Sequence, residues 1–297
     1  EGFTTPEWFK GGIMYQIFPD RFFKKGEIPA EQGKWLHKSW DEKPEYRPNE
    51  QGKVLNNDFF GGNLRGITEQ LDYLQSLHVT VLYLNPIFKA FSNHRYDTGD
   101  YKQIDTLLGT EEDFAALTEE CNKRGIKIML DGVFNHVGRA FPPFREVLEK
   151  REGTDYRFWF NINFYGNSRY NDGLDYENWE GHPELVKLRL ENQDLQRYLM
   201  DAVRFWIDTF DIDGLRLDVS YLLPPWFMEM LRRTVNEKKP EFFLVGEVIH
   251  NNNFQQNVCP ERLDSITNYE GFRSMISAFN SNNLFEIEHS MTRLFAD

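Results

Sequence analysis

The feature that most constrains the fold is a repeated alternation of short apolar runs with segments of helical periodicity. The apolar runs lie at residues 13–18, 79–88, 126–134, 214–219, 242–248 and 263–270. Apolar residues recur at helical spacing in the intervening residues 63–77, 110–125 and 193–210. Strands that alternate with helices pair in parallel through right-handed crossovers. The alternation therefore predicts an α/β fold built from strand–helix units.

Two α/β architectures fit this alternation: a closed barrel and a doubly wound sheet. A dinucleotide-binding doubly wound sheet carries a glycine-rich phosphate turn after its first strand, and no such turn follows residues 13–18. We therefore expect a (β/α)8 barrel of the TIM type, with about six of its strand–helix units in the 297 residues of this chain. The doubly wound sheet is the alternative.

Residues 139–190 interrupt the alternation. They are rich in Trp, Tyr, Phe, Asn and Gly and follow no clear period. A long irregular segment after a strand is usually a functional loop or a small subdomain. We expect residues 1–138 to form strands one to three of the barrel, residues 139–190 a short subdomain, and residues 191–297 strands four to six. A second polar and aromatic loop, residues 24–57, would lie at the same face as the subdomain.

Composition excludes several classes of partner. The net charge of −13 disfavours nucleic acid and anionic membranes. The sequence has no apolar run long enough to span a membrane and no signal peptide. The two cysteines, Cys121 and Cys259, are far apart and need no oxidising compartment. We expect no nucleic-acid or membrane partner and a cytoplasmic location, and the oligomeric state stays open.

Charged side chains stand at the ends of three consecutive predicted strands. The third ends with Asp131 and is followed by His136, the fourth carries Arg216 and Asp218, and the fifth carries Glu247. Barrel enzymes place catalytic groups at these ends, and two carboxylates in one cleft suit glycoside hydrolysis, one as ionised nucleophile and one as protonated acid. We expect Arg216 to keep Asp218 ionised and burial to raise the pKa of Glu247.

Six motifs in order resemble the signatures of the α-amylase family of glycoside hydrolases, family 13. They are YQIFPDRF (15–22), DFFGGNLRGI (58–67), HRYDTGDY (94–101), DGVFNH (131–136), GLRLDV (214–219) and VGEV (245–248). HRYDTGDY and the short excursion most resemble the maltodextrin-degrading neopullulanases and cyclomaltodextrinases. The resemblance implies retaining hydrolysis of α-1,4-glucosidic bonds in maltodextrins through a covalent glycosyl–Asp intermediate.

The resemblance also implies roles for single residues. Asp218 would be the nucleophile, Glu247 the general acid/base, and Arg216 the residue that orients Asp218. The residues expected to contact the α-glucan or to support this site are His136, His94, Tyr96, Asp97, Asp131 and His250. Among them the two first-named histidines would bind sugar hydroxyls, and Tyr96 would stack beneath the sugar ring.

The sequence departs from the family at three points. It contains no Asn-His-Asp motif, which carries the family's third carboxylate after the seventh strand. We therefore expect the last two strands and a C-terminal β domain to lie outside this chain, which speaks against activity of the chain alone. The Lys-His pair after the nucleophile is replaced by Tyr221 and Leu222, and FFKKGE follows Arg21 where neopullulanase relatives carry an Asn-Gly-Asp calcium loop. Asn135 matches a calcium-binding residue of classical members, but one Asn is no calcium site. We expect no cofactor and no bound metal.

Other interpretations remain open at this point. The Arg216–Asp218 pair could be a buried structural ion pair, although such pairs rarely stabilise a fold. An amylase-like barrel could bind sugar or protein without catalysis, because fold does not determine function. An α-glucan glycosyltransferase would use the same two carboxylates. A metallohydrolase would use Asp131, His136, Asp218 and Glu247 as ligands, but the sequence lacks a compact His-rich metal motif.

Overall fold

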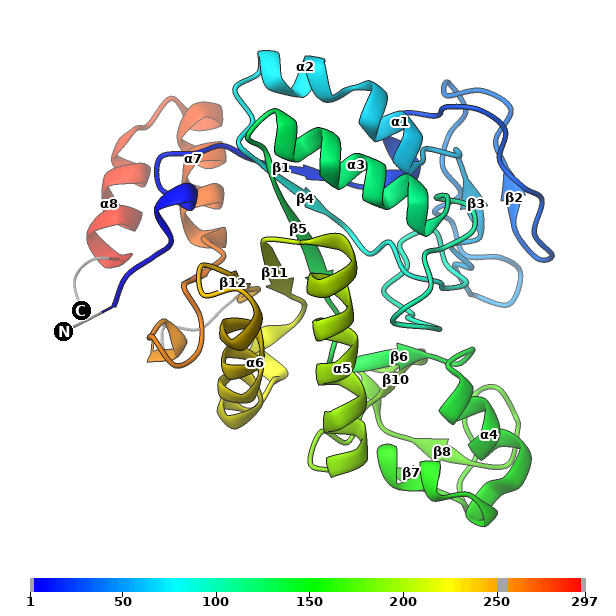
Figure 1. The fold of residues 1–297 in the computed structure, drawn as a ribbon. Helices are drawn as coiled ribbons and strands as arrows, with labels where there is room; N and C mark the ends of the chain where they lie inside the picture. The colour runs from blue at the N-terminus through cyan, green and yellow to red at the C-terminus, as the bar shows by residue number, and fades with distance from the viewer. Residues whose placement is uncertain (1–2, 250–255, 295–297) are drawn as a thin grey trace.

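The computed structural model describes residues 3–249 and 256–294, and a six-stranded parallel sheet lies at its centre (Figure 1). The strands are β1 (Met14–Ile17), β4 (Val81–Leu84), β5 (Lys127–Gly132), β11 (Gly214–Leu217), β12 (Phe243–Gly246) and β13 (Ser265–Ile266). They are hydrogen-bonded in the order β1-β4-β5-β11-β12-β13, so that each new strand joins the same edge. A doubly wound sheet reverses its order instead. The prediction of a TIM-type barrel sheet is confirmed, and the doubly wound alternative is wrong.

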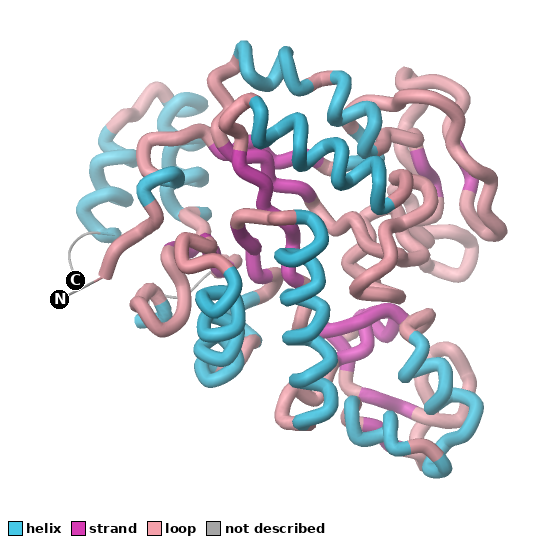
Figure 2. The backbone as a smooth tube through the Cα atoms, in the orientation of Figure 1, coloured by secondary structure: helices cyan, strands magenta, loops and turns pink. Residues whose placement is uncertain are grey.

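The helices flank this sheet (Figure 2). They are α1 (Leu64–Glu69), α2 (Leu71–Ser76), α3 (Glu111–Lys123), α5 (Gln193–Phe210), α6 (Pro225–Lys238), α7 (Tyr269–Ser281) and α8 (Phe285–Leu294). Thr110 and Asp113 form a reciprocal capping box at the start of α3. The single helix expected over residues 63–77 is two short helices, because Gln70 between α1 and α2 leaves the helical conformation.

The strands of the sheet present two different faces, as a side-chain period of two requires. The face toward the helices belongs to the main core and includes Leu82, Leu84, Ile128, Leu130, Leu215 and Leu217. The opposite, inner face carries a smaller cluster of Val81, Tyr83, Met129, Phe243 and Val245. Phe9, in the short helix η1 (Glu7–Phe9), stacks on Phe243 with ring centroids 3.6 Å apart. Aromatic packing therefore fills the inner face near the amino ends of the strands.

Two excursions follow strands β1 and β5. The first contains the short 3-10 helix η2 (Pro19–Arg21) and the paired strands β2 (Trp35–Leu36) and β3 (Asp58–Phe59). The second contains β6 (His136–Gly138), α4 (Pro142–Lys150), η3 (Arg151–Gly153), η4 (Asp155–Trp159), β7 (Ile162–Asn163), β8 (Asp175–Tyr176), β9 (Asn178–Trp179) and β10 (His182–Lys187). It forms a small body beside the sheet, drawn in green in Figure 1. The division of the chain into residues 1–138, 139–190 and 191–297 stays a prediction.

The first and last strands of the second excursion lie side by side. Strand β6 pairs antiparallel with β10, with His136 opposite Lys187 and Gly138 opposite Leu185. The excursion is therefore attached to the sheet by two adjacent strands, which position His136 at the carboxyl end of β5.

No helix in the described parts of the chain is long and apolar enough to cross a membrane. Both cysteines are free thiols, as expected: Cys121 is buried in α3 and Cys259 is partly exposed.

Candidate active site

A single arginine connects three carboxylates at the carboxyl ends of neighbouring strands. Register pairs Arg216 on β11 with Asp131 on β5, and Glu247 directly follows β12. Arg216 Nη1 donates to Asp131 Oδ1 (2.7 Å) and to Asp218 Oδ1 (2.8 Å). Its Nη2 forms an ion pair with Glu247 Oε1 at 2.7 Å. Three nearly buried carboxylates around one guanidinium leave an excess of negative charge, which a purely structural ion pair would avoid.

This charge balance determines the protonation of Asp218. Burial and, after it, the neighbouring charge of Asp131 together raise the pKa of Asp218 to about 7, against the opposing effect of Arg216. Burial also raises the pKa of Asp131. Arg216 was expected to keep Asp218 ionised, but its guanidinium is shared with Asp131 and Glu247, and burial with the Asp131 charge outweighs its effect on the pKa of Asp218.

Glu247 is held by three donors from three elements. Its Oε1 accepts the hydroxyl of Tyr269 (3.1 Å) in addition to the Arg216 contact, and its Oε2 accepts the backbone N–H of Val219 (3.0 Å). Val219 has φ +40° and ψ 45°, a left-handed conformation that β-branched residues rarely adopt. The strained residue immediately after Asp218 thus directs its amide at Glu247, which links the two candidate catalytic carboxylates through the backbone.

Asp131 does not line the cavity itself but supports two side chains that do, Tyr96 and Arg216. Its Oδ2 accepts the hydroxyls of Tyr83 (2.6 Å) and Tyr96 (2.8 Å), while its Oδ1 accepts from Arg216. The side-chain amide of Asn85 donates to the Tyr96 oxygen (2.8 Å). The Tyr96 hydroxyl is therefore held both as a donor, to Asp131, and as an acceptor, from Asn85. The Tyr96 ring lines the cavity.

Two histidines, the buried His136 and the half-buried His94, present N–H groups to the same cavity. His136 Nδ1 accepts from the Asn135 amide (3.1 Å), which places its hydrogen on Nε2, 3.8 Å from Asp218 Oδ2. Among the described residues this Nε2 has no hydrogen-bond partner. Burial, with the charges of His94 and His182, lowers the pKa of His136 to about 3. His94 Nδ1 accepts the N–H of Tyr96 (3.1 Å), and burial lowers the pKa of His94 as well.

These groups surround a cavity of about 710 Å³, which is within the range of small-ligand sites. Residues of the second excursion, including Trp179 and His182, line one part of it, and residues 52–56 of the first excursion line another. Asp97 also lines the cavity, but its carboxylate accepts the N–H groups of Phe91 and Ser92 and so holds its own loop. His250 lies outside the described residues.

Sequence reasoning missed three residues of the site: Trp179, which lines the cavity, and Tyr83 and Tyr269, which donate to Asp131 and Glu247. Tyr83 could have been found, because it lies two residues before Asn85 in a predicted strand and therefore shares its inner face. Tyr269 could not, since it falls in the run 263–270 that was predicted as strand and in fact begins α7. Trp179 lies in the aromatic segment 139–190, where no period distinguishes packing residues from cavity residues.

The cavity gives no sign of a metal centre. Within residues 3–249 and 256–294, no group of three or more His, Cys, Asp or Glu side chains is arranged to hold a metal ion. The absence of a cofactor and of a metal stays a prediction.

A curled parallel sheet of the barrel type, with paired carboxylates beside an arginine at its strand ends, defines the class of α/β-barrel glycosidases. Comparison with known proteins names the family. The model of the family described as "Alpha amylase, catalytic domain" matches residues 16–296. The chain belongs to the alpha-amylase family of glycosidases, as predicted from its motifs.

The similar proteins are enzymes that act on α-glucans. The chain is 37% identical to a maltogenic alpha-amylase of Bacillus acidopullulyticus, over 93% of this chain and 45% of the relative. It is 39% identical to neopullulanase 2 of Thermoactinomyces vulgaris, over 94% of this chain and 45% of the relative. The chain thus spans less than half the length of these relatives.

A solved structure has the same fold. It is the cyclic α-maltosyl-(1→6)-maltose hydrolase of Arthrobacter globiformis in complex with cyclic α-maltosyl-(1→6)-maltose. The TM-score is 0.86 and the identity 32%, over 99% of this chain and 63% of that one.

Proposed function

We propose that the protein containing this chain is a retaining glycosidase that cleaves α-1,4-glucosidic bonds of maltodextrins, with Asp218 as nucleophile and Glu247 as general acid/base. The observation that carries the proposal is the convergence of both carboxylates on Arg216 in one cavity, beside two neutral histidine donors. The relatives, which are named as maltogenic amylase, cyclomaltodextrinase and neopullulanase, support a maltooligosaccharide as the substrate.

The reaction proceeds in two balanced steps. In the first, the ionised Asp218 forms a bond to the anomeric carbon while the bond to the leaving-group oxygen breaks, and Glu247 gives its proton to that oxygen. In the second, Glu247 takes a proton from water, the water oxygen bonds to the anomeric carbon, and the Asp218–sugar bond breaks. Two inversions give a product with the original α configuration. Arg216 stabilises the carboxylate that Asp218 becomes as it leaves.

The remaining groups bind and orient the sugar. The Nε2–H groups of His136 and His94 donate to hydroxyls of the sugar whose bond is cleaved, and the Tyr96 ring packs against its apolar face. Asp131 holds Arg216 and Tyr96 in place. The reaction needs no cofactor or metal. A cytoplasmic location belongs to the same proposal, supported by the Bacillus subtilis relative named intracellular maltogenic amylase.

The test is hydrolysis of maltoheptaose by the full-length protein and, separately, by the 297-residue chain, with product anomers followed by NMR. Wild-type full-length protein should release α-anomeric products. Asp218→Asn and Glu247→Gln should each reduce kcat by about 10²–10⁴-fold and leave maltoheptaose binding nearly unchanged. Asp208→Asn, on the exposed face of α5 and paired with Lys238, is the matched control and should keep full activity.

Three outcomes would contradict the proposal. β-Anomeric products would exclude the retaining mechanism. Full activity of Asp218→Asn would exclude its role as nucleophile. Binding of maltoheptaose without any cleavage by the full-length protein would favour a carbohydrate-binding barrel that has no catalytic activity.

A further inference from the structure

Arg95 separates two cavity residues and points away from both. His94 and Tyr96 line the cavity, whereas Arg95 is 1% exposed and buried on the other side of the loop. Its φ of +61° lies in the left-handed region, which is uncommon for any residue except glycine. This conformation turns the chain so that the residues on either side face the cavity while the guanidinium enters the interior. A buried cation and a left-handed backbone both need a compensating interaction.

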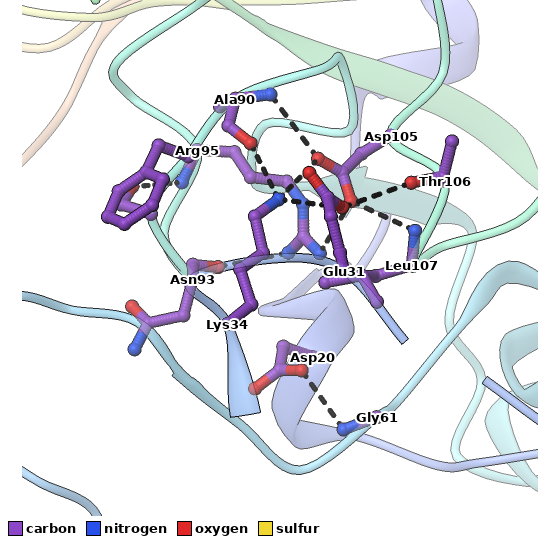
Figure 3. Close-up of polar contacts among 12 residues, drawn as sticks. Asp20, Glu31, Lys34, Gly61, Ala90, Asn93, Arg95, Asp105, Thr106 and Leu107 are labelled. Atoms are coloured by element: carbon purple, nitrogen blue, oxygen red, sulfur yellow. Dashed lines mark hydrogen bonds and ion pairs between the residues drawn. The ribbon is translucent and has the colours of Figure 1, made fainter. Parts of the chain in front are cut away.

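That interaction is a buried carboxylate further along the same loop. Arg95 Nη2 donates to Asp105 Oδ1 at 3.1 Å, and Nη1 donates to the carbonyl of Asn93 at 3.0 Å (Figure 3). Asp105 also accepts the backbone N–H groups of Ala90 (3.3 Å) and Leu107 (3.1 Å). Asp105 therefore connects both ends of the loop to the residue between the two cavity side chains.

A second buried cation reaches the same carboxylate from the first excursion. Lys34 Nζ donates to the carbonyl of Ala90 at 2.9 Å and lies 3.8 Å from Asp105 Oδ2, with its side chain 3% exposed. Glu31 lies 3.1 Å from the same ammonium group (Figure 3). Although burial raises the pKa of Asp105, the charges of Arg95 and Lys34 outweigh it and hold that pKa below its ordinary value. Residues 24–57 and the loop after β4 are thus joined through ionic contacts in the interior.

The ionic cluster of Lys34, Asp105 and Arg95 contributes little to stability alone. Desolvating two cations and a carboxylate offsets most of their attraction, and apolar side chains of the same volume would hold two loops together at least as well. Hydrogen bonds to a guanidinium add direction, since its donors lie in a fixed plane. An ionic cluster therefore suits a place where the orientation of the backbone matters more than its stability.

The orientation of residues 94–96 affects two parts of the site at once. His94 Nδ1 accepts the N–H of Tyr96, so that a tilt of this segment moves the histidine donor and the tyrosine ring together. The Tyr96 hydroxyl donates to Asp131, which in turn holds Arg216. We propose that Lys34, Asp105 and Arg95 are positioning residues, which set His94 and Tyr96 for sugar binding at the cleavage site. This inference rests on the proposed function for the identity of the sugar.

The test compares Arg95→Met with a matched buried ion pair elsewhere. Arg232 on α6 pairs with Asp264 at 2.6 Å, with side chains 7% and 8% exposed, and also donates to the carbonyl of Phe242 before β12. This pair lies at the amino ends of the strands, away from the cavity. In the full-length protein, Arg95→Met should raise the KM and the Kd for maltoheptaose about tenfold or more, and Arg95→Lys should restore part of the loss. Arg232→Met should lower the free energy of unfolding about as much as Arg95→Met does, but should leave KM unchanged.

Three results would test the positioning role of Arg95, Asp105 and Lys34. Equal KM values for Arg95→Met and Arg232→Met, at equal loss of stability, would overturn the inference. If Arg95→Met does not fold by circular dichroism, Lys34→Met replaces it, and an unchanged KM in that variant would overturn the inference too. Weaker maltoheptaose binding by Arg95→Met in a protein that cleaves nothing would uphold the positioning role while the proposed hydrolysis fails.

Discussion

At the scale of single residues, the shared use of Arg216 explains the unusual protonation of its neighbours. Asp131 and Glu247 each take one of its contacts, so Asp218 receives only part of the compensation that its burial requires. A carboxyl group whose pKa lies near 7 exchanges its proton within the working range of most enzymes. The binding of a sugar, which displaces water and brings hydroxyl donors, then acts on a group that is already poised to ionise.

Asp218→Asn is expected to stabilise the protein at pH 8 more than at pH 4. The folded-state pKa of Asp218 is raised above its unfolded value, so its contribution to stability is present at low pH and is lost as the pH rises through about 7. Asparagine has no charge in this pH range, so the variant does not lose this stability as the pH rises. The difference between the gains at the two pH values should be on the order of 2–4 kcal/mol in urea unfolding. A gain that is the same at both pH values would contradict the raised pKa.

Residue-level predictions from sequence succeeded where an alternating pattern exposed them. Arg216 and Asp218 interrupt a run of leucines at every second position, and the period of two places both on the inner face. The pattern could not show that Glu247 and Asp131 would compete for the same guanidinium, because that depends on the register between three strands. The sequence therefore did not indicate that burial and the charge of Asp131 would outweigh Arg216 and raise the pKa of Asp218.

At the scale of elements, strand β6 is positioned by a close backbone contact. Gly138 donates its N–H to the carbonyl of Thr98 at 2.9 Å. A Cβ at Gly138 would lie 2.3 Å from the carbonyl oxygen of Asp97 and 2.9 Å from its carbon. Only glycine lets β6 lie this close to the loop that carries His94 and Tyr96, and β6 also carries His136.

Gly138→Ala is therefore expected to separate β6 from this loop. The free energy of unfolding should fall by about 1–3 kcal/mol, and the KM for maltoheptaose should rise, because the two histidine donors move apart. Gly153→Ala in η3 is the control, since its new Cβ would have its nearest neighbour at 3.9 Å and its φ is not in the left-handed region. Steady-state kinetics and urea unfolding of both variants provide the measurement. Equal effects at the two positions would contradict the close-contact argument.

Element boundaries were predicted best where capping side chains mark them. The segment 193–210 coincides with α5, and Asn192 caps its first turn. The last strand was predicted over residues 263–270, but β13 is only Ser265–Ile266, because Asn268 accepts the N–H of Gly271 and starts α7. The short excursion strands could not be predicted, since pairs of two residues leave no period to detect.

At the scale of the whole molecule, the strands differ in the number of neighbours they have within the described residues. Strands β5 and β11 each pair on both sides, whereas β1 pairs with β4 and β13 pairs with β12. Edge strands open more readily than central strands, because fewer hydrogen bonds and less apolar contact hold them.

Hydrogen–deuterium exchange of the 297-residue chain is expected to follow this order. Amides in β5 and β11 should exchange slowest, and amides in β1 and β13 should exchange at least tenfold faster, corresponding to about 1.4 kcal/mol in opening free energy. Mass spectrometry of peptides that cover each strand provides the measurement. Protection of β1 or β13 equal to that of β11 would show that the edge is paired in solution, for example with a second copy.

The antiparallel pairing of β6 with β10 has a consequence for how such a barrel can change. The first and last strands of the excursion, β6 and β10, pair with each other. The excursion is therefore connected to the barrel as one hairpin, whatever lies between these two strands. Insertions, deletions or exchanges between them leave the register of β5 and β11 unaltered. A surface that lines the cavity, including Trp179, can therefore be replaced as a cassette by grafting, while the carboxylates and their arginine stay where the sheet holds them.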